Sequence, residues 1–336
     1  MPEVRRDLIS GRRIILAPER HTRPQEYGVS DGTDDHLRCP FCAGSEELTP
    51  APVCWYPPSR PEDYRQTWRV RVIENKYPAL LAPTEESSLP SWSNASPEGI
   101  HEVFVESREH VESFGQLSDD DATWTWLAYR DRILNLHQQE GWSYAQIFKN
   151  ARKASGASIA HSHSQLLATR FIPSLVETEL AAASEHHQRE ATCLFCTMIE
   201  AERTSTTRVI VETNGVIALC PAASRFPYEV WLLPTDHLPR FEVSPTTLLE
   251  RISKTLKRLI LALDTKLDRP PYNYFLHTTP FGTSFEDTYH WHLELFPRVI
   301  TPGGYEWATD CYVNTVLPEQ AAHELRGAWP GPASAD

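Results

Sequence analysis

One order of motifs occurs twice along this chain of 336 residues. Each copy begins with a CxxC pair, CPFC at 39–42 and CLFC at 193–196. A strand-like stretch that ends in histidine follows, HEVFVESREH at 101–110 and YEVWLLPTDH at 228–237, and the two overlay without a gap. A helical stretch, a further strand and a strand with His-x-His complete each copy. Repetition of one such unit predicts two similar halves.

The elements of each copy predict a fold of the α+β class. The strand-like stretches alternate apolar and polar residues, whereas 121–139 and 246–267 carry the longer period of a helix. A chain of this length is sufficient for two domains of ordinary size or for one large domain, and the repeat favours two. We therefore expect an N-terminal half over 1–178 and a C-terminal half over 179–336.

Charge and hydropathy exclude two classes of partner. The formal net charge is −13, from 32 basic and 45 acidic residues, so affinity for a nucleic-acid backbone through a basic patch is not expected. The apolar runs, such as RLILAL at 258–263, are far shorter than the ~20 residues of a membrane span. The first residues, MPEVRRDLISGRR, lack the apolar core of a signal peptide. We expect a cytoplasmic protein without nucleic-acid or membrane partners.

Four of the seven cysteines lie in the two CxxC pairs, and each pair follows a polar stretch. In a cytoplasmic chain this spacing favours metal binding or redox chemistry over a disulfide. A redox pair of the thioredoxin type would normally follow a strand and open a helix, so metal binding is the favoured interpretation. Two thiolates and two imidazoles suit tetrahedral zinc, and four protein ligands make the site structural. A chance arrangement is the alternative, and the repeated order argues against it. The predicted sets are Cys39, Cys42, His110 and His161 in the first half, and Cys193, Cys196, His237 and His290 in the second.

The two halves differ around the His-x-His strand. On a strand, His161, His163 and Gln165 share one face, so a metal role for His161 leaves His163 for another task. The segment before it, SGAS at 155–158, has small residues that let backbone N–H groups approach an anion. The second copy has the bulkier, acidic TTPFGTSFEDTY, with His292 and Glu294 in the equivalent places. One half is predicted to be active and the other a degenerate copy.

A set of stretches along nearly the whole chain resembles the galactose-1-phosphate uridylyltransferase branch of the histidine-triad superfamily, and within it the plant ADP-glucose phosphorylase type. The resemblance implies two tandem histidine-triad-like repeats, each a half-barrel antiparallel sheet with helices. The stretches are APERHTRP (17–24), CPFC, RVIENKYPAL (71–80), FKN (148–150), SGASIAHSHSQ (155–165), YEVWLLPTDH, PPYNYFLHT (270–278) and GGYE (303–306).

The resemblance implies nucleotidyl transfer by a ping-pong route. His163 would attack the α-phosphorus of a nucleoside diphosphate sugar and form a covalent nucleotidyl-histidine, since one imidazole nitrogen can attack while the other donates to a carbonyl. Gln165 would donate its amide to the phosphoryl oxygens. The acceptor would be a sugar 1-phosphate or inorganic phosphate. The backbone of Ser155, Gly156, Ala157 and Ser158 would cradle the phosphate.

Further substrate contacts are implied by the same resemblance. Arg20 and Arg23 would lie beside the nucleotide, and Asn75 and Asn150 would contact ribose and phosphate. Residues Gly304, Tyr305 and Glu306 would reach the sugar phosphate across a homodimer interface. The alternatives are solvated charges for the two arginines and a turn residue for Asn75. His292 is expected to be structural or a secondary metal contact.

Two other functions share these motifs. A hydrolase of dinucleoside polyphosphates or phosphoramidates often has a third histidine where this chain has Gln165, so glutamine favours transfer. A zinc-stabilised scaffold that binds nucleotides without catalysis would have a damaged nucleophile strand, and this strand is intact. Ser162 stands where the better-known uridylyltransferases have proline, which weakens the assignment to UDP-hexose and galactose 1-phosphate. The base, the sugar and the acceptor stay open.

Overall fold

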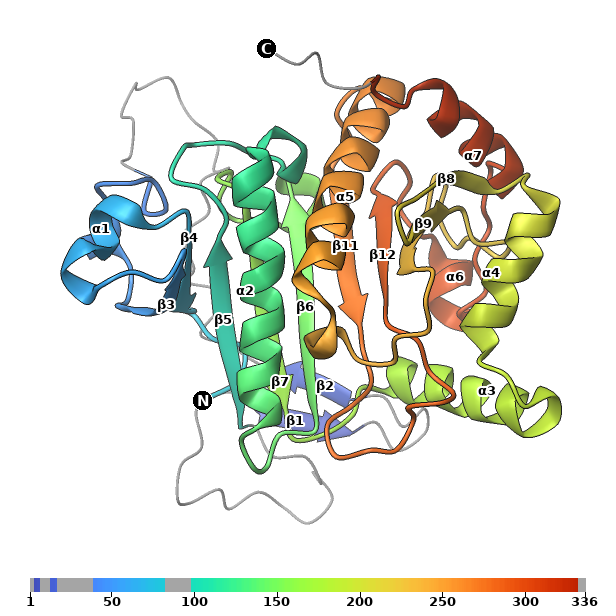
Figure 1. The fold of residues 1–336 in the computed structure, drawn as a ribbon, viewed down its shortest axis with the longest axis horizontal. Helices are drawn as coiled ribbons and strands as arrows, with labels where there is room; N and C mark the ends of the chain where they lie inside the picture. The colour runs from blue at the N-terminus through green and yellow to red at the C-terminus, as the bar shows by residue number, and fades with distance from the viewer. Residues whose placement is uncertain (1–2, 7–12, 17–38, 82–97, 332–336) are drawn as a thin grey trace.

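The computed structural model describes residues 3–6, 13–16, 39–81 and 98–331. It combines one large antiparallel sheet with helices, so the prediction of an α+β fold is confirmed (Figure 1). Strands β1 (Glu3–Arg6) and β2 (Arg13–Leu16) form a separate antiparallel pair.

Ten strands form the main sheet, in the order β3-β4-β5-β7-β6-β11-β12-β10-β9-β8. The first five strands of this order come from the first half of the chain and the last five from the second. The two sets have the same internal order, and β6 pairs with β11 where they meet. The strands are β3 (Pro52–Tyr56), β4 (Val70–Glu74), β5 (Gly99–Val105), β6 (Tyr144–Ala151), β7 (His163–Thr169), β8 (Val209–Thr213), β9 (Val216–Leu219), β10 (Val230–Pro234), β11 (Tyr272–His277) and β12 (His292–Pro297).

Two long helices, α2 (Asp119–His137) and α5 (Thr246–Leu267), lie side by side across one face of the sheet (Figure 1). On α5, Leu249, Ile252, Leu256 and Leu263 recur at helical spacing and are buried in the largest apolar core. The other helices are α1 (Tyr64–Thr67), α3 (Ser174–Glu190), α4 (Leu194–Ser205), α6 (Gly304–Thr309) and α7 (Pro318–Gly327), with 3₁₀ turns at Glu46–Leu48, Pro61–Asp63, Phe114–Gln116, Lys153–Ser155 and Phe241–Val243. None of the helices in the described ranges is long and apolar enough to cross a membrane.

The structure shifts the gapless overlay of the stretches 101–110 and 228–237 by one residue. Val103 pairs with Gln165, whereas Trp231 pairs with Glu294. Because Gln165 and Glu294 stand at the same distance from the first histidine of their HxH pairs, β10 is displaced by one residue relative to β5. The division of the chain at residue 178 stays a prediction, and it falls within α3.

Candidate active site and metal centres

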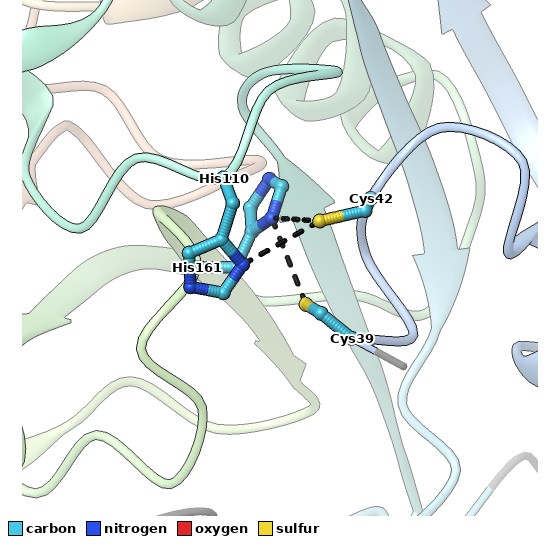
Figure 2. Close-up of side chains that lie close together, drawn as sticks. All are labelled: Cys39, Cys42, His110 and His161. Carbon is cyan, nitrogen blue, oxygen red and sulfur yellow. Dashed lines mark hydrogen bonds between the residues drawn. The ribbon is translucent and has the colours of Figure 1, made fainter. Parts of the chain in front are cut away.

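The first predicted metal set converges in space, from residues that lie up to 122 positions apart (Figure 2). The ligand atoms of Cys39, Cys42, His110 and His161 all lie within 4.8 Å of one another. Cys42 Sγ is 3.4 Å from His110 Nδ1 and 3.5 Å from His161 Nδ1. Two sulfurs and two ring nitrogens in this arrangement could hold a metal ion.

The tautomer of His161 favours metal binding. Its Nε2–H donates to the carbonyl of Ser107 at 2.9 Å, so Nδ1 presents its lone pair to the two thiols. Burial lowers the pKa of His161 to about 3, which keeps the imidazole in its neutral, ligating form. Local hydrogen bonds therefore prepare the ring to ligate a metal.

The second predicted set repeats this geometry. The ligand atoms of Cys193, Cys196, His237 and His290 also lie within 4.8 Å of one another. His237 Nε2 donates to the Glu286 carbonyl at 2.6 Å, and His290 Nε2 donates to the Pro234 carbonyl at 3.1 Å. Both rings thus direct Nδ1 toward Cys196, at 3.4 and 3.6 Å from its sulfur. The structure brings together all eight predicted ligands.

His163 begins β7 and lies on the face of the sheet opposite α2, next to the first metal set. Its Nδ1–H donates to the carbonyl of His161 at 2.8 Å, which leaves the lone pair on Nε2. The ring of Phe41, from the CxxC loop, meets the His163 ring edge-on at 5.3 Å between centroids. The metal loop and the strand therefore fix the position of the imidazole together.

Gln165 follows on the same face and is oriented by a residue that the sequence analysis did not identify. His101 Nδ1 accepts from the Ala79 backbone N–H at 2.9 Å, so its Nε2–H donates to Gln165 Oε1, also at 2.9 Å. Asn75 Nδ2 approaches the same oxygen at 3.5 Å. With Oε1 engaged, the NH₂ group of Gln165 is the end of the amide that remains for donation to a ligand. Asn75, an implied substrate contact, thus lies beside Gln165.

The segment before β7 forms a tight loop around Asn150. Gly156 has a left-handed backbone with φ of 97°, and a Cβ there would lie 3.6 Å from Asn150 Nδ2. Asn273 Nδ2 donates to Asn150 Oδ1 at 2.7 Å and to the Ser155 carbonyl at 3.0 Å. The backbone N–H groups of Ser155 and Gly156 donate within the loop, to Arg152 and Lys153. A phosphate cradle would therefore depend on the N–H groups of Ala157 and Ser158.

The predicted site residues near the C-terminus lie away from β7, the strand that begins with His163 (Figure 1). Gly304, Tyr305 and Glu306 lie in α6, beside the strands of the second half and away from β7 (Figure 1). The Tyr305 side chain is 59% exposed. Arg20 and Arg23 lie outside the described residues.

A third cluster lies on the second half, where β11, β12 and α3 meet. It joins Glu179, His277, His292 and Glu294, whose ligand atoms lie within 4.8 Å of one another and could hold a metal ion. Arg225 ion-pairs with Glu294, so a cation already neutralises one carboxylate. The sequence analysis named His292 as a structural or metal-contacting residue but missed Glu179 and His277, because neither belongs to a spaced motif.

The comparisons with known proteins agree with this geometry. A family model described as "Galactose-1-phosphate uridyl transferase, N-terminal domain" matches residues 5–173. The chain is 33% identical to ADP-glucose phosphorylase from Arabidopsis thaliana over 97% of this chain and 92% of that protein. The chain belongs to the galactose-1-phosphate uridylyltransferase family. The predicted resemblance is thus confirmed, and with it the prediction of a nucleotidyltransferase.

Other members of the galactose-1-phosphate uridylyltransferase family match over similar lengths. Galactose-1-phosphate uridylyltransferase from Thermotoga maritima is 26% identical, over 97% of this chain and 98% of that protein. A crystal structure of ADP-glucose phosphorylase from Arabidopsis thaliana with bound ADP-glucose superimposes with a TM-score of 0.75 at 30% identity, covering 97% of this chain and 99% of the other. A second model, for a domain of unknown function, matches residues 99–327.

Proposed function

We propose that this enzyme transfers a nucleotide from a sugar nucleotide through a covalent nucleotidyl-His163 intermediate. The observation that carries the proposal is the hydrogen bond from His163 Nδ1 to the His161 carbonyl, because it makes Nε2 the nucleophilic nitrogen. Gln165, oriented by His101, lies on the same face to donate to the phosphoryl oxygens.

The reaction has two displacement steps. His163 Nε2 attacks the α-phosphorus, the bond from phosphorus to the bridging oxygen breaks, and the sugar 1-phosphate leaves with the electron pair. The positive charge on the ring is stabilised through Nδ1–H by the His161 carbonyl. A phosphate oxygen of the acceptor then attacks the same phosphorus, and the N–P bond returns its electron pair to Nε2. The Asn75 and Asn150 side chains and the loop at Ser155, Gly156, Ala157 and Ser158 are the proposed substrate contacts.

The acceptor is either a sugar 1-phosphate or inorganic phosphate. The first is the reaction of a uridylyltransferase and the second that of a phosphorylase, which releases a nucleoside diphosphate. The 33% identity to ADP-glucose phosphorylase, against 26% to the Thermotoga maritima uridylyltransferase, favours phosphate and an adenine nucleotide as the first pair to test.

We further propose zinc in both Cys₂His₂ clusters. Each cluster supplies four ligands, which suits tetrahedral zinc and reserves no coordination position for substrate. When bound, the metal would supply folding free energy. In the first cluster it would also tie the CxxC loop to the residue that precedes the His163 strand, and in the second to the residue that precedes the His292 strand.

A homodimer is the proposed assembly. Tyr305 and Trp307 of α6 are 59% and 70% exposed, and in Figure 1 α6 lies away from β7, the strand that begins with His163. In a homodimer, Gly304, Tyr305 and Glu306 of one protomer would contact the sugar phosphate bound in the active site of the other. The roles of Arg20 and Arg23 beside the nucleotide and the cytoplasmic location stay predictions.

The proposed function is tested by trapping the intermediate. The full chain is mixed briefly with ADP-glucose or UDP-glucose labelled at the α-phosphate, and the protein is then denatured. We expect label that is stable in base and lost in acid, as for a phosphorus–nitrogen bond to histidine. Adding glucose 1-phosphate or inorganic phosphate before denaturation should remove the label into a nucleoside diphosphate sugar or a nucleoside diphosphate.

A matched pair of variants assigns the nucleophile. His163→Asn should abolish labelling and lower turnover by a factor on the order of 10⁴ or more. His292→Asn, at the equivalent place in the second half, should retain labelling. Absence of label with both sugar nucleotides, or label that survives His163→Asn, would contradict the proposed function. Loss of the label to water alone would favour a hydrolase.

A further inference from the structure

A buried ion pair lies directly behind the strand of His163, on the face covered by α2. Lys149 of β6 pairs with Glu106, just after β5, and their side chains are 1% and 0% exposed. The Lys149 ammonium also donates to Ser162 Oγ at 2.9 Å and to the carbonyl of His163 at 3.0 Å. Its three N–H donors thus have three acceptors, one of which is the backbone of the proposed nucleophile.

The contact to the His163 carbonyl replaces a missing strand hydrogen bond. The pairing of β6 with β7 ends at Phe148 and Gln165, two residues before it would reach His163. Lys149 therefore holds the His163 carbonyl on the β6 side, where the ladder between β6 and β7 has ended, while β5 still pairs with His163 through Val105. On the other side, the Ser162 hydroxyl donates to Glu106 at 2.6 Å, and the Glu106 backbone N–H donates to the Ser162 carbonyl at 3.3 Å.

The rest of the surroundings is polar and fully buried. The Tyr129 hydroxyl lies 3.0 Å from Glu106 Oε1, 2.6 Å from Ser164 Oγ and 2.8 Å from the Tyr274 hydroxyl. Burial lowers the pKa of Lys149, and the Glu106 carboxylate opposes this shift. Such networks stabilise little on balance, because removing two charges from water costs several kcal/mol.

The second half shows that the fold does not require this network. Phe148 pairs with Gln165 as Phe275 pairs with Glu294, so Leu276 stands where Lys149 does. Trp291 and Leu293 replace Ser162 and Ser164, and Pro234 ends β10 at the place where Glu106 follows β5. These four residues are apolar and buried. The same sheet thus packs with apolar side chains where no nucleophile is carried.

We propose that Lys149, held by Glu106 and Ser162, is a positioning residue that fixes the backbone at His163 for attack on phosphorus. This inference rests on the proposed function, since it concerns the same nucleophile. Lys149 acts through His163 and touches no substrate, because it lies on the opposite face of β7.

The test removes both charges together. In Lys149→Met/Glu106→Leu, no unpaired charge is left in the core, so we expect a folded protein with a melting temperature near that of the parent. The rate of His163 labelling in a single turnover and kcat should both fall at least about ten-fold, while KM changes less than about threefold. Leu276→Met, at the equivalent position, controls for a general disturbance of the sheet and should label at the parent rate.

Each outcome decides a different point. Labelling of the double variant at the parent rate would overturn the positioning role and make the pair purely structural. If the double variant does not fold, Lys149→Met/Glu106→Gln retains more of the original volume and is judged by the same rates. Failure of the parent chain to label with either sugar nucleotide would instead contradict the proposed function itself.

Discussion

The β7 strand of the first half and the β12 strand of the second half have equivalent neighbours in the sheet. They differ in the charged side chains that surround the second histidine of each HxH pair. Among the described residues, Gln165 and His101 share the face of His163, and the His101 Nε2–H donates to Gln165 Oε1. At the equivalent places, His292 is surrounded by Glu294 and Glu229, with Arg225 between the two carboxylates and Glu179 on His277. A phosphate that approached His292 would meet buried carboxylates, whereas one that approaches His163 meets an amide donor.

The comparison shows that one backbone arrangement of the HxH strand can serve proposed catalysis in one half and packing of the core in the other. Both strands begin after a histidine of a Cys₂His₂ set, and both second histidines donate Nδ1–H to the carbonyl of the first, at 2.8 Å for His163 and 3.1 Å for His292. The ring of His292 is instead packed against Trp231 and Phe195, at centroid distances of 5.1 and 4.8 Å. Equal backbone geometry therefore serves the proposed nucleophile in one half and a core residue in the other.

The largest expected effect concerns the two metal sites. Cys39→Ser and Cys193→Ser should each lose one of two zinc ions per chain and about 3 kcal/mol or more of unfolding free energy, because a structural metal site contributes to folding. Metal analysis and chemical denaturation measure both quantities. Only Cys39→Ser should also lower activity per folded molecule, by less than about ten-fold, since His161 precedes His163 on its strand. Full zinc content in either variant would show that its ligand set is wrong.

An intermediate effect is expected when the charge difference between the halves is reversed. Gln165→Glu places a carboxylate where phosphoryl oxygens should bind, so kcat should fall about 100-fold, as for loss of one transition-state donor. Glu294→Gln makes the same change in the opposite direction in the second half and should alter kcat less than about twofold. Steady-state kinetics with the donor identified by trapping measure both. A large loss in Glu294→Gln would mean that the second half takes part in catalysis.

The smallest effect is a pH dependence of stability that only the second half should show. Burial alone would lower the pKa of His277, but the Glu179 carboxylate 2.9 Å away raises it above its ordinary value. A raised folded-state pKa stabilises below the unfolded value of about 6.5 and is lost as pH rises through the folded pKa. Between pH 6 and 9, the parent should therefore lose about 1 kcal/mol that Glu179→Gln does not.

Asn150 provides the control for this pH dependence, because it holds the position of His277 in the first half and does not titrate. Asn150→Gln should leave the slope of stability against pH as in the parent, measured by thermal denaturation. An equal slope in the parent and in Glu179→Gln would show that the His277–Glu179 pair does not contribute.

The convergence of the two Cys₂His₂ sets and the strand that carries His163 were predictable because short motifs carry them. CxxC pairs and an HxHxQ strand place chemistry within a few residues, and their repetition marked the distant His110 and His237 as the remaining ligands. His101, Glu106, Lys149, Glu179 and His277 were not predicted as partners of these motifs. Their partners lie between 13 and 98 positions away, and no local spacing signals such a pair.

The sequence by itself determined the repeated units, the two Cys₂His₂ sets and the alternation that puts His161, His163 and Gln165 on one face. The tertiary structure decided how the units join, through β6 and β11, and what lies behind each HxH strand. It also decided the one-residue displacement of β10, which puts Glu229 rather than Tyr228 at the place of His101. The physical reason is that strand period and ligand spacing are local properties, whereas pairing register and burial of charge depend on residues far apart in the chain.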